Sequence, residues 1–312
     1  MKVHYNIQQL PAFHHAVITI GTFDGLHNGH HKIIELMQIE AAKIDGETVI
    51  ITFDPHPRKV VAKERTPLFL INTLDEKIAL LEKANIDHLV VVPFTTEFSN
   101  QSAEDYIEDF LVNTFHPHTI IIGYDHRFGK NRSGDYTLLE AKQDVFNYVV
   151  KEIPVHMLAQ STISSTKIRE ALLRGDLPTA QQFLGYDYFF RGTVITGNKL
   201  GRTIGYPTAN LLIEGEHKLV PGNGVYAVLI NCAKAGINNV SGMMNIGIRP
   251  TLEGTARTIE VNIFDFDKDI YGETLTITLK KFLREEVKFN GLEGLKNQLA
   301  MDKINAAAAL KM

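Results

Sequence analysis

The 312-residue sequence has very little cysteine and no long apolar segment. Its single cysteine, Cys232, cannot form a disulfide within the chain. No apolar run approaches the length of about 20 residues that a transmembrane helix needs. The opening residues, MKVHYNIQQL, also lack the basic-then-apolar pattern of a signal peptide. We therefore expect a cytoplasmic protein without a membrane partner.

The sequence also lacks an excess of positive charge. It has 32 basic and 36 acidic residues, which gives a formal net charge of −4. No overall field therefore favours nucleic acid, although small basic sites can still bind phosphates. At this length, 44% hydrophobic residues can fill two cores. We expect two globular domains and no nucleic-acid partner, and a weak homo-oligomer is compatible with this composition.

Short apolar runs alternate with amphipathic segments from Ala16 to about Gly185. The runs are β-branched with little polar alternation, which is typical of buried strands. They are AVITI (16–20), TVIITF (48–53), HLVVVPF (88–94), HTIIIGY (118–124) and NYVVKEI (147–153). Between them, residues 103–111 follow helical spacing, and residues 73–76 have the pattern of a capping box. This alternation predicts a doubly wound parallel α/β sheet, which binds ligands at the carboxyl ends of its strands.

The pattern changes near residue 185 to strict alternation of apolar and polar residues. TIEVNI (258–263) and TLTITL (274–279) have period two, with glycine and proline turns between such runs. This pattern predicts an all-β antiparallel barrel or sandwich, closed by a final helix from about Leu292. We therefore expect two domains, residues 1–185 and residues 186–312.

The stretch ITIGTFDGLHNGHHKII, residues 18–34, places a glycine-bearing turn and two histidines between a predicted strand and a predicted helix. A helix N-terminus offers free backbone N–H groups and positive dipole charge, which suit a polyphosphate. His27 and His30 can face one point, and Gly29 lets a ligand approach the backbone. The alternatives are surface histidines or a metal pair. A metal pair needs a third ligand, and no cysteine or HExxH pattern is nearby.

A second helix start, ISSTKIREALLRGD at residues 163–176, begins with small hydroxyl residues. Ser164, Ser165 and Thr166 can simply cap that helix. With Arg169 one turn further on, they can instead bind phosphate oxygens through charge-assisted hydrogen bonds. Two such helix starts in one α/β domain favour phosphate binding more strongly than either does alone.

These motifs resemble a known family. GTFDGLHNGHHKII and ISSTKIR are similar to the paired signatures of the HxGH nucleotidyltransferases. TFDPHPRKV and GYDHRFGKNRSGD narrow the resemblance to the adenylyltransferase module of bacterial bifunctional riboflavin kinase/FAD synthetases, over most of residues 15–185. His126 departs from this family, which more often has an aromatic residue there.

The resemblance implies that His27 and His30 bind ATP phosphates and stabilise the transition state. The further residues that it implies are Gly21, Phe23, Ser164, Thr166 and Arg169 for ATP, and Pro55, Pro57, Asp125 and Arg127 for the flavin pocket. The chemistry agrees, because the FMN phosphate is already an anionic nucleophile and needs no general base. Position and positive potential, from histidine donors, Arg169, helix N-termini and Mg²⁺, are what the reaction requires.

GNKLGRTIGYPTANL, residues 197–211, has three glycines before a PTAN sequence. It is neither a Walker A loop nor a GxGxxG fingerprint, and a glycine-rich barrel turn is the ordinary alternative. Together with GVYAV, MNIGIRPT, IEVNIFDFDKDIYGE and FLREEVKF, however, it resembles the riboflavin kinase barrel over nearly all of residues 186–312. The resemblance implies that Thr208 and Asn210 coordinate Mg²⁺ and ATP phosphates, and that Gly197, Lys199 and Gly201 lie over the nucleotide.

Glu260 is the candidate catalytic base. In the alternating run it projects opposite the apolar face, so it can point at a ligand, although a solvated carboxylate is the ordinary interpretation. Transfer of a γ-phosphate to a neutral ribityl hydroxyl releases a proton, which a positioned carboxylate can accept. Glu260 also matches the base of the family. Arg284 either shapes the flavin-side cleft or pairs with Glu285 or Glu286.

We therefore expect a Mg²⁺-dependent bifunctional enzyme. The C-terminal module would convert riboflavin and ATP to FMN and ADP, and the N-terminal module would convert FMN and ATP to FAD and pyrophosphate. Two alternatives stay open. One is a nucleotidyltransferase for another phosphorylated acceptor, and the other is a flavin-binding regulator with an inactive module.

Overall fold

The structure is a computed structural model that describes residues 1–61, 68–153, 163–197, 200–215, 217–251 and 254–311. The chain divides into two compact units. The first comprises Met1–Leu68 and Leu74–Ser164, and the second comprises Phe69–Thr73 and Ser165–Met312. The expected domain boundary between residues 185 and 186 stays a prediction.

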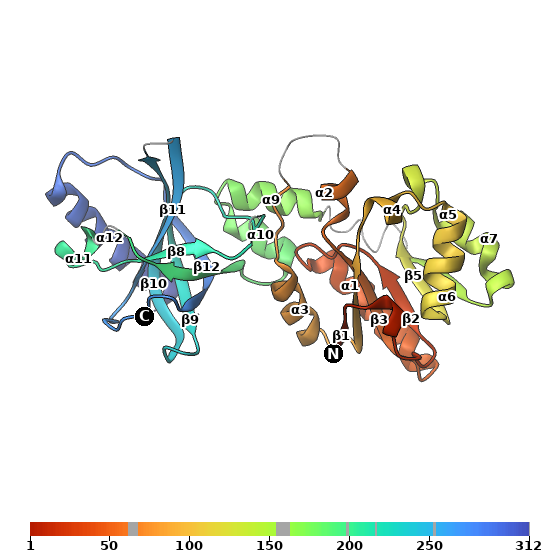
Figure 1. The fold of residues 1–312 in the computed structure, drawn as a ribbon. Helices are drawn as coiled ribbons and strands as arrows, with labels where there is room; N and C mark the ends of the chain where they lie inside the picture. The colour runs from red at the N-terminus through yellow and green to blue at the C-terminus, as the bar shows by residue number, and fades with distance from the viewer. Residues whose placement is uncertain (62–67, 154–162, 198–199, 216, 252–253, 312) are drawn as a thin grey trace. The chain divides into compact units, whose positions relative to one another are not determined.

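The first unit is built around a six-stranded parallel sheet with the strand order β1-β4-β3-β2-β5-β6 (Figure 1). Its strands are β1 (Lys2–His4), β2 (Val17–Ile20), β3 (Thr48–Asp54), β4 (His88–Pro93), β5 (Thr119–Gly123) and β6 (Val149–Ile153). Its longer helices are α1 (Asn28–Lys43), α3 (Leu74–Lys83) and α7 (Tyr136–Phe146). Its shorter helical elements are η1 (Ile7–Gln9), α2 (Pro57–Val61), α4 (Thr96–Ser99), α5 (Ala103–Asp105), η2 (Tyr106–Val112), α6 (Asn113–Phe115) and η3 (Lys130–Arg132).

Helices cover both faces of this sheet. Along β2, Val17 belongs to the apolar cluster that includes Met37 of α1. Its neighbour Ile18 belongs to a second cluster, which includes Phe110 of η2. Successive strand residues point to opposite faces, so both faces need apolar side chains. The predicted doubly wound α/β architecture is confirmed.

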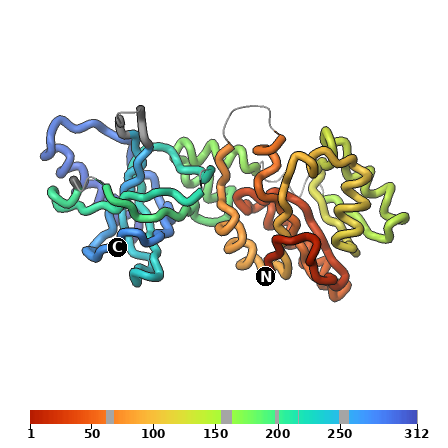
Figure 2. The backbone as a smooth tube through the Cα atoms, in the orientation of Figure 1, coloured from red at the N-terminus to blue at the C-terminus, as the bar shows by residue number. Residues whose placement is uncertain are grey.

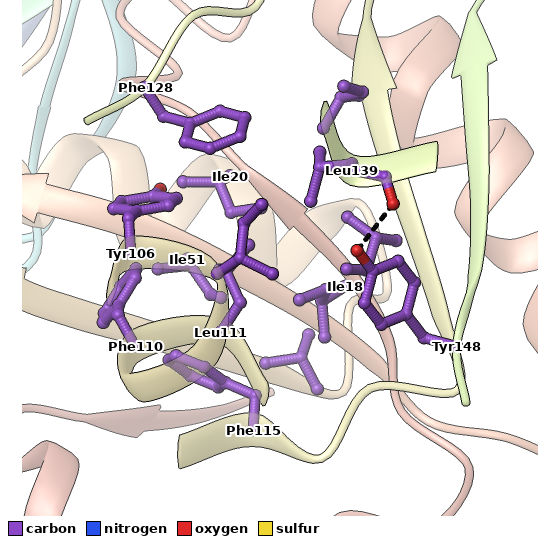
Figure 3. Packing of buried hydrophobic residues seen from close by; sticks show 14 of the residues in the cluster. Ile18, Ile20, Ile51, Tyr106, Phe110, Leu111, Phe115, Phe128, Leu139 and Tyr148 are labelled. Carbon is purple, nitrogen blue, oxygen red and sulfur yellow. Dashed lines mark hydrogen bonds between the residues drawn. The ribbon is translucent and has the colours of Figure 1, made fainter. Parts of the chain in front are cut away.

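The predicted helix over residues 103–111 is present and continues to Phe115 as α5, η2 and α6. Its middle part, η2, is π-helical. Figure 3 shows Tyr106, Phe110 and Phe115 beside Ile18 and Ile51 of the sheet. The residues that follow helical spacing in the sequence therefore lie in the core.

The second unit contains a closed barrel with the strand order β10-β11-β8-β7-β12-β9, in which neighbouring strands are antiparallel. Figure 2 traces the chain through this barrel to the blue C-terminal helix. The strands are β7 (Phe189–Ile195), β8 (Ala209–Ile213), β9 (Gly224–Cys232), β10 (Ile237–Thr251), β11 (Gly254–Ile263) and β12 (Thr274–Arg284). The helices are α9 (Ser165–Leu173), α10 (Leu177–Leu184), α11 (Leu200–Thr203) and α12 (Leu292–Leu310).

Side chains on the barrel strands alternate between its interior and its exterior. Val261 of β11 and its cross-strand partner Met244 are fully buried. On the other face of the same strands, Met243 packs in a cluster with Phe264 and with Ala306 of α12. Helix α12 therefore covers part of the outer barrel surface. The predicted barrel and terminal helix are both confirmed.

Candidate active sites

The first candidate site lies at the carboxyl edge of the parallel sheet, where α1 begins. The turn at residues 21–27 follows β2, Pro55 and Pro57 follow β3, and Asp125 and Arg127 follow β5. Because β3, β2 and β5 are adjacent and parallel, these residues share one edge of the sheet. The structure thus brings the predicted phosphate-binding turn and the predicted flavin-binding residues to the same side.

The turn before α1 is held by buried apolar side chains. Phe23 and Leu26 have positive φ angles of 47° and 35° and exposed fractions of 1% and 0%. Positive φ is costly for such residues and persists only where the surrounding structure imposes it. A Cβ at Gly21 would lie 3.1 Å from the Phe23 ring, so glycine gives that ring its space. Gly21 and Phe23, both predicted to bind ATP, therefore shape the turn.

His27 and His30 lie together at the start of α1. Their rings are stacked, with centroids 3.7 Å apart and an interplanar angle of 11°. His27 is the N-cap of the helix, and its Nδ1 accepts the backbone N–H of His30 at 3.3 Å. A neutral imidazole that accepts at Nδ1 carries its proton on Nε2. The cap therefore leaves the Nε2–H of His27 as a donor.

Both imidazoles are neutral at pH 7. Burial lowers the pKa of His27 to about 4. Burial also lowers the pKa of His30 well below its ordinary value, and the nearby His27 and Lys77 lower it further. The Nδ1 atom of His30 is buried and has no hydrogen-bond partner within the described residues. Because a buried polar atom costs free energy unless it is paired, this atom is suited to binding a ligand.

The loop after β5 is anchored rather than loose. Phe128 is buried and forms a β-bridge with Gly134, at which a Cβ would overlap the Phe128 ring. Arg127, one of the expected flavin-binding residues, forms an ion pair of 2.8 Å with Asp135. Asp125 is exposed. The segment after β5 therefore carries a buried aromatic anchor.

The second predicted phosphate-binding motif, at residues 163–176, contains residues of both units. Ser164 ends the first unit, whereas Thr166 and Arg169 lie in α9 of the second unit. The guanidinium Nε of Arg169 donates to the carbonyl oxygen of Phe69 at 2.8 Å. The ATP-binding roles of Ser164, Thr166 and Arg169 stay predictions.

One group at the first site was not predicted from the sequence. Lys77, in the first turn of α3, is 8% exposed, and its Nζ donates to Thr52 Oγ1 of β3 at 3.2 Å. Burial lowers the pKa of Lys77 to about 8, although Asp24 and Asp54 raise it. Neither the spacing nor the composition around Lys77 distinguishes it from a surface lysine of an amphipathic helix.

The second candidate site is a cavity of about 250 Å³ on the barrel exterior. Register places Asn210 and Asn245 opposite Glu260, so these three side chains leave the same face of the sheet. The polar side of the cavity and its glycine loop include Gly201, Thr208, Asn210, Glu260, Arg284 and Asp302. Apolar residues from the segment after β12 and from α12 complete the lining, among them Phe289, Leu295 and Leu299.

Glu260 points into this cavity, as its position in the alternating run predicts. Its neighbours Ile259 and Val261 are buried in the barrel, whereas its carboxylate lines the cavity. The Thr208 hydroxyl donates to Glu260 Oε2 at 3.5 Å. The structure therefore brings the predicted base and one predicted magnesium ligand together.

The glycine loop packs directly against the PTAN segment. A Cβ at Gly197 would overlap the side-chain amide of Asn210, and a Cβ at Gly201 would overlap the carbonyl of Tyr206. Both positions therefore require glycine if Asn210 and the backbone at Tyr206 are to keep their places. Lys199, the third residue predicted to cover the nucleotide, lies outside the described residues.

The donor set at PTAN is suited to Mg²⁺. A hydroxyl, an amide oxygen and a carboxylate, from Thr208, Asn210 and Glu260, line one cavity, and hard cations prefer oxygen ligands. At the start of α1, by contrast, the two stacked side chains are imidazoles. Across the described residues no group of three or more histidine, cysteine, aspartate or glutamate side chains could hold a metal ion. Within the described residues, His27 and His30 therefore have no third histidine, cysteine, aspartate or glutamate that could complete a metal site with them.

Arg284 lines the cavity but pairs differently from the predicted alternative. Its Nε and Nη2 donate to the two carboxylate oxygens of Asp302 in α12, at 2.8 and 2.7 Å. It contacts Glu285 only through the backbone carbonyl, and the Glu286 carboxylate accepts from Asn245 instead. The predicted pairing with the carboxylate of Glu285 or Glu286 is wrong, because the planar guanidinium finds a better bidentate partner on the helix.

Among the helices that the structure describes, none has the length and apolar character needed to cross a membrane.

Comparisons with known proteins agree with this two-site arrangement. The model of the FAD synthetase family matches residues 10–167, and the model of the riboflavin kinase family matches residues 184–310. The chain is 38% identical to the bifunctional riboflavin kinase/FMN adenylyltransferase of Haemophilus influenzae, over 93% of each chain. It is 39% identical to the protein of the same name from Listeria monocytogenes, over 94% of this chain and 91% of that one.

Among solved structures, one described as a macrolide-efflux protein from Streptococcus pneumoniae matches with a TM-score of 0.86 and 29% identity, over 98% of both chains. The two family matches follow one another on this chain, and the full-length relatives carry both activities in their names. The chain therefore belongs to the family of bifunctional riboflavin kinase/FMN adenylyltransferases, with an FAD synthetase domain followed by a riboflavin kinase domain.

Proposed function

We propose that the barrel unit converts riboflavin and ATP to FMN and ADP, and that the α/β unit converts FMN and a second ATP to FAD and pyrophosphate. The observation that carries this proposal is the shared cavity of Glu260, Thr208 and Asn210. It combines a carboxylate with the hydroxyl and amide groups that are proposed to bind Mg²⁺ and the ATP phosphates. The α1 site offers neutral donors at a helix N-terminus instead, so the two sites suit different chemistry.

In the kinase step, the terminal ribityl hydroxyl oxygen of riboflavin forms a bond to the γ-phosphorus of ATP. The bond between that phosphorus and the β–γ bridging oxygen breaks, and ADP leaves. The hydroxyl proton passes to the Glu260 carboxylate, since a neutral alcohol must lose its proton as it becomes a phosphate ester. The Thr208 hydroxyl, 3.5 Å from Glu260 Oε2, orients that carboxylate.

Mg²⁺ is proposed at the same cavity, with Thr208 and Asn210 as its protein ligands. When bound, it would neutralise the charge that develops on the transferring phosphates. Gly197, Gly201 and Lys199 are proposed to cover the nucleotide. Arg284 is proposed to border the flavin side of the cavity, where Asp302 fixes its guanidinium.

In the adenylyl step, a phosphate oxygen of FMN forms a bond to the α-phosphorus of ATP, and pyrophosphate leaves. The nucleophile is already an anion, so no proton acceptor is required. His27 and His30 donate hydrogen bonds to the phosphates without adding a formal charge, because burial keeps both rings neutral. The residues proposed to bind ATP with them are Gly21, Phe23, Ser164, Thr166 and Arg169. The residues proposed for the flavin pocket are Pro55, Pro57, Asp125 and Arg127.

The proposed ligands are therefore riboflavin, FMN, FAD and ATP. The cytoplasmic location, the absence of nucleic-acid and membrane partners, and the possibility of a weak homo-oligomer stay predictions.

Incubating the purified chain with riboflavin, ATP and Mg²⁺ tests the proposal. Chromatography should show FMN first and FAD later. Replacing riboflavin with FMN should give FAD directly, together with pyrophosphate. A protein that forms neither product, or that prefers a non-flavin phosphorylated acceptor, would contradict the proposal.

A further inference from the structure

Lys77 is connected to the α1 turn by a chain of hydrogen bonds. Its Nζ donates to Thr52 Oγ1 at 3.2 Å, and the Thr52 hydroxyl donates to the carbonyl oxygen of Thr22 at 3.3 Å. Thr22 belongs to the turn that leads into His27, and Thr52 is fully buried. The lysine of α3 is therefore anchored at the carboxyl edge of the sheet, next to the proposed phosphate site.

The ammonium of Lys77 is incompletely satisfied. An ammonium has three N–H donors, whereas the hydrogen bond to Thr52 is the one that Lys77 makes among the described residues. Lys77 also forms no ion pair within 4.0 Å there, yet only 8% of it is exposed. A buried charge without a close partner is costly, so the remaining donors are suited to an anion.

Two carboxylates and one imidazole interact electrostatically with Lys77. Asp24, in the turn after β2, and Asp54, at the end of β3, favour the charged lysine but do not offset its burial. His30 of α1 is close enough for the lysine charge to lower its pKa. The unpaired Nδ1 of His30 and the free donors of Lys77 are independent signs of a ligand at this place.

We propose that Lys77 is a further phosphate-binding residue of the adenylyl-transfer site, where its ammonium, held by Thr52, donates to a phosphate oxygen bound at the start of α1. This inference rests on the proposed adenylyl transfer. The oxygen belongs either to ATP or to the FMN acceptor, since both present phosphate. Lys77 thus supplies the formal positive charge that the neutral histidines do not.

The pH dependence of FAD formation follows from this role. In the free protein the pKa of Lys77 is about 8, because burial disfavours the ammonium. Below that pH the ammonium is present and binds phosphate, and above it the charge is lost. The kcat/KM of FAD formation should therefore fall above about pH 8, approaching a factor of about 10 per pH unit. The charge of an arginine at this position would not be lost in that range.

The test compares Lys77→Met and Lys77→Arg with wild type, and uses Lys83→Met, an exposed lysine at the end of the same helix, as the control. Lys77→Met should lower kcat/KM for FAD formation about 10- to 100-fold at pH 7, the range expected for a charged hydrogen bond. The difference in kcat/KM between Lys77→Met and wild type should become smaller above pH 8, because the wild-type lysine also loses its charge there. Lys77→Arg should remove the fall above pH 8.

The substrates are varied separately. A loss in kcat/KM confined to ATP assigns the contact to an ATP phosphate, and a loss confined to FMN assigns it to the acceptor phosphate. Kinase activity, measured as FMN formed from riboflavin, should stay unchanged in every variant.

Two outcomes would overturn the role of Lys77. One is a folded Lys77→Met protein with wild-type kcat/KM for both substrates. The other is an alkaline fall in kcat/KM that is the same in wild type and in Lys77→Arg, a readout that holds even if the methionine variant fails to fold. A wild-type protein that makes no FAD would instead reject the proposed adenylyl transfer itself.

Discussion

At the residue scale, the two sites differ in what they offer a reacting phosphate. The barrel cavity presents a carboxylate, Glu260, within 3.5 Å of a hydroxyl. The α1 site presents two stacked imidazoles that burial keeps neutral. An alcohol nucleophile needs a proton acceptor and an anionic nucleophile does not, so this difference matches the two reactions.

Glu260→Gln should abolish most kinase activity. The amide keeps the shape of the carboxylate but cannot accept the hydroxyl proton, so the rate of FMN formation should fall about 100- to 10,000-fold. Chromatographic assay of riboflavin phosphorylation measures this loss. Conversion of added FMN to FAD by the same protein is the internal control and should persist. Unchanged riboflavin turnover in this variant would remove Glu260 from its role.

His30→Ala should have the reverse effect. It removes a donor from the α1 site, so FAD formation from FMN should fall about 100- to 1,000-fold, as for other donors that stabilise developing charge. FMN formation from riboflavin should continue at the wild-type rate, and FMN should accumulate. Equal damage to both activities would indicate a folding defect instead of a catalytic one.

Sequence patterns predicted some of these residues and missed others for a physical reason. Glu260 follows from the two-residue period of a strand, because its buried neighbours fix the direction of its side chain. His27 and His30 follow from a turn between a strand and a helix. Lys77 and Asp302 act through contacts to distant segments, Thr52 and Arg284, and no local pattern encodes such pairs.

At the element scale, the sequence predicts the strands that have an apolar run of several residues. The five apolar runs of the first unit all contain strands, because buried parallel strands require nearly continuous β-branched sequence. The edge strand β1, only three residues long, was missed, since KVH is too short to show a period. The π-helical form of η2 was also missed, because helical spacing alone does not distinguish it from an α-helix.

Helix α12 is held on the barrel by a nearly buried ion pair. Asp302 is 1% exposed and accepts two hydrogen bonds from Arg284 and one from Gln298. Replacing Asp302 leaves the guanidinium without its carboxylate beside the cavity. Breaking such a pair leaves a poorly solvated charge without a partner. We therefore expect a weaker attachment of α12 and a change in the shape of the cavity that it borders.

Asp302→Ala should therefore destabilise the barrel unit by about 3 kcal/mol, the lower end of the range for breaking a buried pair, because the Arg284 side chain retains 21% exposure. Thermal or denaturant unfolding measures the change, and the KM for riboflavin should rise. Glu293→Ala, an exposed acidic residue near the start of the same helix, is the matched control and should change little. Equal stability of the two variants would show that the pair does not hold α12.

At the scale of the whole molecule, the chain forms two compact units, and each contains one of the two groups of proposed catalytic residues. His27 and His30 lie in the first unit, and the barrel cavity lies in the second. Thr166 and Arg169, which are proposed to bind ATP with the two histidines, belong to the second unit. The matches to two families, one after the other on the chain, agree with this division. FMN is the product of the second unit and the substrate of the first, so FMN released by one unit must reach the other.

The most direct measurement of this central claim mixes two singly inactivated proteins. Glu260→Gln with riboflavin and ATP should make almost no FMN, and His30→Ala should stop at FMN. Equal amounts of both proteins with riboflavin, ATP and Mg²⁺ should produce FAD, because released FMN from one protein is adenylylated by the other. If the mixture yields no FAD while each variant retains its own remaining activity, the claim of two separately acting phosphorus-transfer sites is contradicted.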